Sequence, residues 1–383
     1  MKQVAVFETQ MKFAEVVDIL RPLAESNNAQ VELSLANAYL NLAINGRTPD
    51  AVSDAAALAV AAAHDKTLGP ITREKIQPAI DFAERAARHG SAGGFNILYI
   101  IYANGFGVEA DIPKAIGYLK RASAGGDLGA KYNYAVMLYE GGAFLKQDVS
   151  EACILFDELG RDPATMNLSA YYLGQIVYRG QCGHKADKVE GMKLVRIGAR
   201  AGVRQAERDM GKSFDFGWLG QVDRKMALSW YQKAADHGDP FSEWRIGMAY
   251  VNGEMGPKDS AKGVSYLQHS AESDFPQGLT DLGVMYAIGD GVAKDVYKAR
   301  VLYERAAQLG EPHAFKELAA MYANGEGVPV DKLHARVLCL QSVAMGESES
   351  AAPCKALAKN LTVGQLEQSD REFSEWQKQK TAK

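Results

Sequence analysis

The side chains that could do chemistry in this chain are seven histidines, four cysteines and one glycine-lysine-serine triplet. No two histidines stand four residues apart, and neither His-Glu-x-x-His nor Cys-x-x-Cys occurs, so no pattern indicates a zinc site. Gly211-Lys212-Ser213 resembles the end of a phosphate-binding loop, but Ala206 stands where that loop requires a glycine. The nucleophile motif Gly-x-Ser-x-Gly is missing as well. We therefore expect no catalytic residue, no metal ion, no cofactor and no enzymatic activity.

Composition restricts the choice of architecture. The chain has 383 residues, more than the ~250–300 that one hydrophobic core usually serves, so it holds either several domains or a repeat array. It is 47% hydrophobic and 23% charged, as folded proteins are, and its net charge of -4 argues against a nucleic-acid partner. The longest apolar run, 55–63, is too short to span a bilayer, so we expect no transmembrane segment. Residues 2–10 lack the apolar core of a signal peptide, and whether a signal peptide or lipid anchor was removed stays open.

The dominant pattern is an internal repeat of 36 to 38 residues. In each repeat a glycine closes one segment, an aspartate lies in the loop that follows, and a small residue starts the next segment. The glycines are Gly105, Gly142, Gly180, Gly217, Gly253, Gly289 and Gly325; the aspartates are Asp111, Asp148, Asp187, Asp223, Asp259, Asp295 and Asp331; the small residues are Ala115, Ala152, Gly191, Ala227, Gly263, Ala299 and Ala335. Three markers in phase over seven repeats predict a stacked array of supersecondary units.

Each repeat is expected to fold as two helices. The first places apolar residues on one face, as at Ala314, Leu318 and Met321, and ends at Gly325, because glycine accepts the left-handed conformation of a helix C-terminus. The second is exemplified by 299–307. No alternating pattern typical of strands appears. The predicted fold class is therefore all-α, an α/α superhelical solenoid of about eight helix-turn-helix repeats.

The full pattern resembles the Sel-one-like repeat family, a relative of the tetratricopeptide repeat. It reads Leu-Gly-x-x-Tyr, Gly-x-Gly-Val, Asp, and Ala-x-x-Tyr-x-x-Ala-Ala-x-x-Gly, and 274–310 and 311–346 match it most closely. Two repeats depart from it: Gly191 replaces the usual alanine, and Phe214 stands in the tyrosine position. The resemblance implies a tetratricopeptide-like solenoid and roles as an adaptor or assembly protein.

Four regions follow from this pattern. Residues 1–27 are expected to hold an N-terminal capping helix, and 28–90 a divergent first repeat interrupted by a helical insertion at 45–77. Residues 91–346 contain the seven Sel-one-like repeats. The remainder, 347–383, is expected to supply C-terminal capping helices and a polar tail, since the ends of an array have no neighbour to cover them.

By analogy with tetratricopeptide units, first-helix positions that face away from both neighbouring helices line a concave partner-binding groove. These residues are Asn133, Tyr171, Gln175, Arg179, Arg208, Lys212, Trp244, Asn252, Lys316 and Asn324. Hydrogen-bond donors, cations and aromatic rings on one face suit an extended peptide or an acidic polymer, and the alternative of an ordinary solvated face stays open. Trp244 is the most informative, because a large aromatic is least expected on an exposed face.

The cysteines form two pairs in this arrangement. Cys339 and Cys354 are almost equidistant from a turn near Glu347, and Cys153 and Cys182 fall at helix ends on one side of the stack. We expect both pairs to reach the ~5.5–6 Å Cα separation of a disulfide, which favours an oxidising compartment and a periplasmic or secreted protein, while a cytoplasmic location stays open. The alternative, four small buried thiols, stays open.

Three functions remain. The first is a non-enzymatic scaffold or adaptor that binds another protein on the concave face or edge of the superhelix. The second, suggested by the resemblance of 171–180 to such proteins, is a periplasmic component of an alginate-like exopolysaccharide secretion or assembly complex. The least favoured is an enzyme of β-lactam-hydrolase type, since the cysteines are few and differently spaced. The identity of the partner and the oligomeric state stay open.

Overall fold

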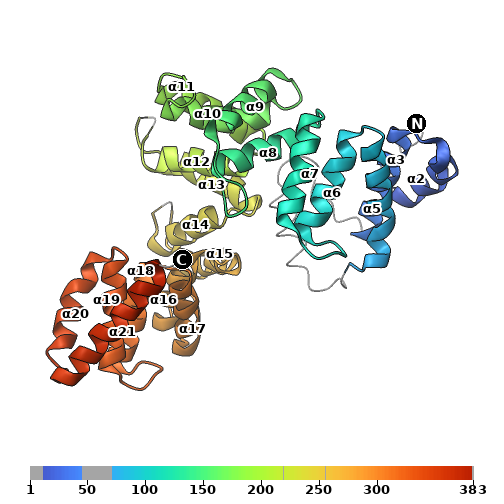
Figure 1. The fold of residues 1–383 in the computed structure, drawn as a ribbon. Coiled ribbons are helices and arrows are strands. Elements are labelled where there is room, and N and C mark those ends of the chain that lie inside the picture. Colours follow the sequence, from blue (N-terminus) through green and yellow to red (C-terminus); the bar gives the residue numbers. More distant parts are fainter. Residues whose placement is uncertain (1–11, 45–70, 219, 255, 382–383) are drawn as a thin grey trace. The chain divides into compact units, whose positions relative to one another are not determined.

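A computed structural model describes residues 12–44, 71–218, 220–254 and 256–381, and within these ranges the backbone forms helices joined by loops, with no strand (Figure 1). The predicted all-α solenoid of helical hairpins is confirmed for this part of the chain. The chain divides into two compact units, Met1–Val203 and Arg204–Lys383, which are described separately.

The first unit is a succession of antiparallel hairpins preceded by a short helix. Its elements are α2 (Phe13–Leu20), η1 (Arg21–Ser26), α3 (Ala29–Ala43), α5 (Arg73–Arg88), α6 (Ala92–Asn104), α7 (Ile112–Ala124), α8 (Leu128–Glu140), α9 (Val149–Arg161), α10 (Met166–Arg179) and α11 (Lys188–Arg200). Helix α3 pairs with α5, α6 with α7, α8 with α9, and α10 with α11. The helix expected at 51–63 lies outside the described residues.

The second unit repeats the same construction and ends in two further helices. Its elements are α12 (Arg204–Asp215), α13 (Arg224–Asp236), α14 (Pro240–Asn252), α15 (Ser260–Glu272), α16 (Pro276–Ile288), α17 (Val296–Gln308), α18 (Pro312–Asn324), α19 (Lys332–Ala344), η2 (Ser348–Ser350), α20 (Ala351–Ala358) and α21 (Val363–Thr381). Even-numbered helices from α12 to α18 are the first helices of their repeats, and each pairs with the helix that follows it.

The recurring aspartate starts the second helix of each repeat. Asp331, for example, accepts a hydrogen bond from the backbone N–H of His334 at 2.9 Å, which satisfies one of the free donors at the start of α19. The same contact is made by Asp111, Asp148, Asp187, Asp223, Asp259 and Asp295. The loop marker in the sequence is therefore an N-cap.

The recurring glycine ends the first helix in most repeats. Gly325 is the C-cap of α18 with φ 77°, a conformation that residues with a Cβ rarely adopt. Two repeats differ: Gly141 rather than Gly142 caps α8, and Gly217 lies in the loop beyond the end of α12. These two loops therefore leave their first helices by different routes.

Glycine also permits a close helix approach in the repeat that departs from the family pattern. A Cβ on Gly174 of α10 would lie 2.7 Å from the carbonyl oxygen of Gly191 on α11. A Cβ on Gly191 would meet the Gly174 carbonyl at the same distance. Glycine in place of alanine thus lets the backbones of α10 and α11 touch, at a cost in helix propensity.

In the second unit a fully buried tyrosine of the second helix fills the space over a first-helix glycine. Tyr303 lies against Gly283, where an added Cβ would be 2.6 Å from ring atom Cε1. Tyr231 lies against Gly211 in the same way. In these two hairpins an aromatic ring of the second helix therefore packs directly on the backbone of the first helix.

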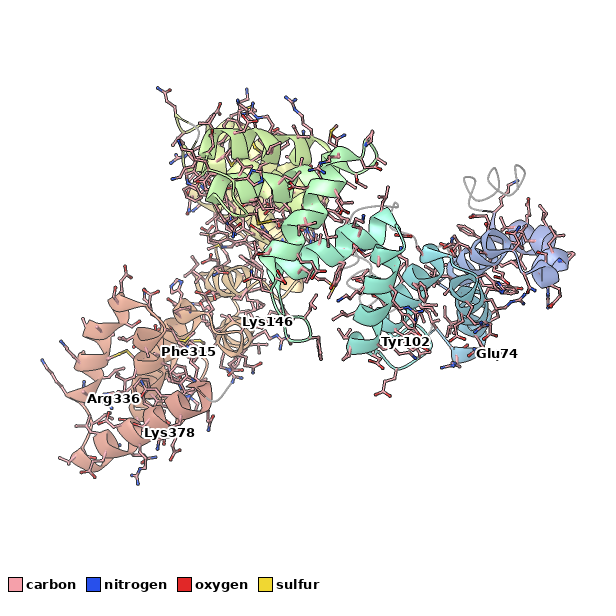
Figure 2. The ribbon with its side chains drawn as sticks, turned by 45° about the horizontal axis from the view of Figure 1, so that its top comes forward. Glu74, Tyr102, Lys146, Phe315, Arg336 and Lys378 are labelled. Atoms are coloured by element: carbon pink, nitrogen blue, oxygen red, sulfur yellow. A yellow bond between two sulfur atoms is a disulfide. The ribbon has the colours of Figure 1, made fainter. Side chains whose placement is uncertain are left out.

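The C-terminal segment closes the last hairpin with a helix. Helix α21 packs against α19, and its Trp376 meets Phe315 of α18 edge to face, with ring centroids 6.3 Å apart. Phe315 and Lys378 mark α18 and α21 in Figure 2. The segment expected to be a polar tail is thus an amphipathic helix that covers apolar surface at the end of the repeats.

Candidate functional site

The groove residues expected in the first unit do not share one environment. Asn133 and Gln175 are half-buried on α8 and α10, and Arg179 is exposed at the end of α10, where it donates a hydrogen bond to the Tyr139 hydroxyl at 3.2 Å. Tyr171 is only 8% exposed. The prediction that Tyr171 lines an accessible groove is therefore wrong, because the structure buries this residue.

The burial of Tyr171 follows from its neighbours. Its ring meets Tyr172 edge to face at 4.9 Å, and Tyr172 stacks on Phe156 at 4.7 Å. On its other side, the backbone of Tyr171 lies against Gly198 of α11, where no side chain intervenes. Burial raises the pKa of Tyr172 well above its ordinary value. Adjacent tyrosines on a helix point to different faces, and here both faces are covered.

In the second unit the expected residues of α12 contact the following first helix. The Arg208 guanidinium donates a hydrogen bond to the Asp239 carboxylate at 3.1 Å, and Asp239 is the N-cap of α14. Lys212 Nζ lies 4.1 Å from the centroid of the Phe241 ring. Burial, together with the charge of Arg208, lowers the pKa of Lys212. The face of the Phe241 ring therefore replaces part of the water around the Lys212 ammonium group.

Trp244 lies next along this face and is half-buried. Its Nε1–H donates a hydrogen bond to the Asp281 carboxylate of α16 at 2.6 Å. Its ring contacts Phe241 and Phe275, with centroids 5.4 and 6.0 Å away. Burial raises the pKa of Asp281, and the hydrogen bond from Trp244 only partly offsets that rise. The tryptophan therefore joins two successive first helices while keeping part of its ring accessible.

The remaining expected residues bind their own surroundings. Exposed Asn252 and Asn324 sit at the last positions of α14 and α18 and donate hydrogen bonds to Glu254 and Glu326 at 3.0 and 3.2 Å. Lys316 pairs with Glu349 at 3.1 Å. These contacts order the loops and the C-terminal cap.

We call Lys212, Phe241, Trp244, Phe275 and Asp281 the aromatic face. Sequence reasoning missed Phe241, Phe275 and Asp281. The two phenylalanines flank the prolines that begin α14 and α16, a position that could have placed them at the starts of first helices. Three half-buried rings between an ammonium group and a carboxylate can hold a ligand by contact.

Neither a metal centre nor a membrane span adds to this picture in the described ranges. No group of three or more histidine, cysteine, aspartate or glutamate side chains there is placed to hold a metal ion. No helix there is long and apolar enough to cross a membrane.

The four cysteines form two disulfides, as the sequence predicted. Cys153 of α9 bonds to Cys182 in the loop after α10, with Cα atoms 6.4 Å apart. Cys339 of α19 bonds to Cys354 of α20, with Cα atoms 5.6 Å apart. The first disulfide therefore joins α9 to the loop between α10 and α11, and the second joins α19 to α20.

Comparison with known proteins agrees with this architecture. The family model of the Sel1 repeat matches residues 100–127, 129–158, 167–203, 204–239, 240–275, 276–311 and 316–347. A protective antigen of uropathogenic Escherichia coli that displays an SLR fold is 22% identical with a TM-score of 0.66, over 94% of this chain and 71% of that one. A Sel1 repeat protein from Oxalobacter formigenes is 21% identical with a TM-score of 0.49, over 89% of this chain and 90% of that one. Comparison with curated proteins finds no match.

Proposed function

This chain belongs to the Sel1 repeat family, and we propose that it is a non-enzymatic scaffold that holds a partner protein on the aromatic face of its second unit. Repeat folds of this kind are typical of protein-binding scaffolds, because stacked hairpins present long surfaces rather than one deep pocket. The partner's identity is not part of the proposal.

The observation that carries the proposal is the partial exposure of three aromatic rings. Phe241, Trp244 and Phe275 contact one another yet remain half-buried. Aromatic rings at the centre of an accessible face are the residues that most often dominate binding energy in protein interfaces. Because Trp244 is tied to Asp281, its ring is already fixed and loses little conformational freedom when a partner covers it.

The two disulfides support an extracytoplasmic location for this scaffold. Disulfides persist in oxidising compartments such as the bacterial periplasm and are rare in the cytosol. The alternative role in exopolysaccharide secretion has no supporting contact in the described residues, and it stays a prediction.

A photo-crosslinking amino acid tests the proposed face. We expect the full chain with the crosslinker in place of Phe275 to trap a specific partner in the source cell. A matched chain with the crosslinker in place of Tyr297, which is an exposed aromatic on α17, should not trap that partner. The substitution Trp244→Ala should reduce the trapped product while circular dichroism stays unchanged. Equal trapping from both positions, or trapping that survives Trp244→Ala, would show that the face is wrongly assigned.

A further inference from the structure

The loop between α12 and α13 and the first turn of α13 carry exposed apolar side chains that are not part of the aromatic face. Phe216, Trp218, Val222 and Met226 are 58%, 53%, 54% and 41% exposed. The rings of Phe216 and Trp218 stack on each other with centroids 5.9 Å apart. We call these four residues the loop patch. It lies at one end of its hairpin, on the loop and on the first turn of α13.

The next repeat shows that the loop patch is not required by the fold. Four polar residues occupy the equivalent positions of the sixth repeat: Asn252, Glu254, Lys258 and Lys262. Both repeats nevertheless use the same aspartate cap and pair their two helices in the same way. A hairpin of this kind therefore forms with polar residues at these four positions, and the apolar side chains of the fifth repeat need another reason.

Basic residues adjoin the loop patch. Arg224 and Lys225 are exposed on the first turn of α13. The nearby Asp223 carboxylate is engaged by the backbone N–H of Met226 at 2.9 Å, and Glu254 is paired with Arg245 at 2.7 Å. Arg224 and Lys225 thus lie between Val222 and Met226 in the chain, while the carboxylates of Asp223 and Glu254 are engaged by Met226 and Arg245.

We propose that the loop patch, with Arg224 and Lys225, docks the protein on an anionic lipid bilayer. Tryptophan and phenylalanine favour the headgroup region, and flanking arginine and lysine are attracted to anionic lipids. A fluid bilayer accommodates a small group of apolar side chains without a preformed pocket that matches their shape.

The size of the loop patch argues against a second protein copy as its occupant. The exposed parts of four such side chains amount to roughly 300–400 Å², whereas each partner in a stable complex buries roughly 800 Å². Insertion into a bilayer needs only a few apolar side chains assisted by charge.

Vesicle co-sedimentation of the full, disulfide-bonded chain tests the proposal. We expect binding to vesicles containing phosphatidylglycerol, weaker binding to pure phosphatidylcholine, and a loss of binding as salt screens the cations. Brominated lipids should quench part of the tryptophan fluorescence, and the variant Trp218→Glu should remove that quenching.

The decisive variant transplants the sixth repeat's residues into the fifth: Phe216→Asn, Trp218→Glu, Val222→Lys and Met226→Lys. Each new residue already occupies the equivalent position of the next repeat, so helical content should not change. The exchange adds one net positive charge, which alone would strengthen binding to anionic vesicles. We nevertheless expect binding to fall at least about tenfold, because the apolar side chains are gone.

Two control variants separate this surface from the others. Ile288→Asn replaces an exposed apolar residue at the position of the seventh repeat that corresponds to Phe216, and it should bind vesicles like the wild type. Trp244→Ala, on the aromatic face, should also leave vesicle binding unchanged. Failure of the wild type to bind anionic vesicles would overturn the proposal, and so would full binding by the transplanted variant. Self-association abolished by the transplant, without vesicle binding, would assign the loop patch to a second copy instead.

Discussion

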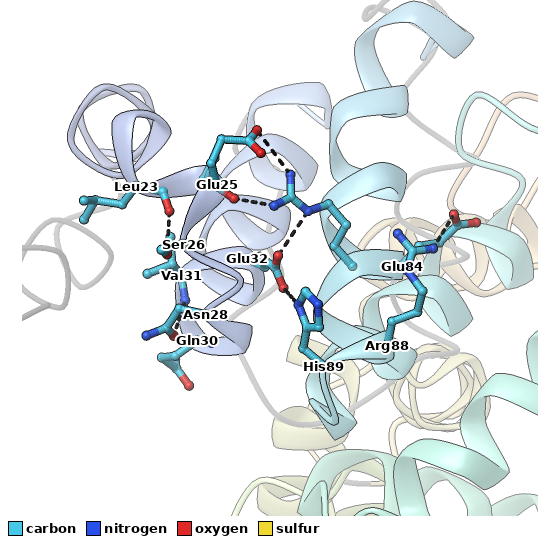
Figure 3. A network of polar contacts seen from close by, with 12 residues as sticks. Leu23, Glu25, Ser26, Asn28, Gln30, Val31, Glu32, Glu84, Arg88 and His89 are labelled. Carbon is cyan, nitrogen blue, oxygen red and sulfur yellow. Dashed lines mark hydrogen bonds and ion pairs between the residues drawn. The ribbon is translucent and has the colours of Figure 1, made fainter.

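Glu32 and His89 lie in contact across the first hairpin, with Oε2 and Nδ1 2.6 Å apart although 57 residues separate them in the chain (Figure 3). Glu32 is the fourth residue of α3, and His89 is the C-cap of α5. Glu207 and His237 make the same contact at 2.7 Å, again from the fourth residue of a first helix to the C-cap of the second. A buried glutamate thus joins the start of one helix to the end of its partner in two separate repeats.

The first prediction concerns Arg85, which completes the network around Glu32. Arg85 Nε donates a hydrogen bond to Glu32 at 3.0 Å, and its guanidinium also donates to the carbonyl oxygen of Ala24. Since Glu32 is fully buried, we expect Arg85→Ala to lower the free energy of unfolding by about 3 kcal/mol, because the buried carboxylate loses its guanidinium partner and keeps only the contact with His89.

Urea unfolding with hydrogen exchange over α3 and α5 measures this loss. The matched control is Arg88→Ala on the same helix, whose pair with Glu84 at 3.9 Å is exposed and should contribute less than about 0.5 kcal/mol. Equal effects of the two variants would mean that the buried network contributes no more stability than the exposed ion pair.

The second prediction is a pH dependence at Glu243. Burial, aided by the carboxylates of Asp239 and Glu272, raises the pKa of Glu243 from 4.5 to about 7. A raised pKa in the folded state means that Glu243 contributes full stability below pH 4.5 and loses that contribution as the pH rises through about 7. The difference in pKa corresponds to at most about 3.4 kcal/mol, and partial solvent access should reduce this contribution to about 1–2 kcal/mol.

We therefore expect Glu243→Gln to be more stable than the wild type near pH 8, with a free energy of unfolding about 1–2 kcal/mol higher. Near pH 4 the two free energies of unfolding should be about the same. Urea titrations at both pH values test this, and the acidic titration serves as the internal control. A variant that is less stable than the wild type at alkaline pH would contradict the assigned environment.

The third prediction concerns the disulfide between Cys339 and Cys354, which closes a separation of 15 residues. A loop of this length corresponds to about 3 kcal/mol of stabilisation through restriction of the unfolded chain. We expect the pair Cys339→Ala and Cys354→Ala to lose about this amount.

Thiol titration of the denatured, unreduced wild type provides the accompanying measurement. It should detect no free thiol, because the structure pairs all four cysteines. Detection of two thiols would leave one disulfide unformed, and detection of four would remove the argument for an oxidising compartment.

The fourth prediction uses the contact between Gly283 and Tyr303. A methyl group at Gly283 would lie 2.6 Å from the ring, so Gly283→Ala should destabilise the protein by about 1–2 kcal/mol through overpacking. Gly117, in the middle of α7, has nothing within 4 Å of its Cβ direction, so Gly117→Ala should instead stabilise by about 0.5–1 kcal/mol.

Thermal unfolding of the two alanine variants distinguishes a packing role from helix propensity. The smaller ring-free side chain in Tyr303→Leu should relieve the clash, so the double variant should lose less than the sum of the single ones. Shifts of the same sign at Gly283 and Gly117 would refute the packing role.

Much of the fold could be predicted from the sequence because the same marker residues recur at the same positions in successive repeats. An aspartate that recurs in phase, such as Asp295, indicates a helix start, and Gly289 before it indicates a helix end. The pairing of Cys339 with Cys354 also follows once two adjacent helices are placed antiparallel.

The candidate site was harder to predict because accessibility depends on contacts between repeats. Periodicity alone does not distinguish Tyr171, which Gly198 allows to sink between helices, from Trp244, which Asp281 holds at the surface. The polar composition of α21 likewise gives little sign of the tertiary contact between its Trp376 and Phe315.

The disulfide between Cys339 and Cys354 affects where this protein opens locally and is cut by proteases. A covalent bond holds α20 to α19, whereas α2, α3 and α5 are held to one another by packing and by the ionic contacts of Glu32. Local opening, and with it attack by proteases, should therefore be easier among α2, α3 and α5 than in the α19–α20 pair for as long as the Cys339–Cys354 bridge stays oxidised.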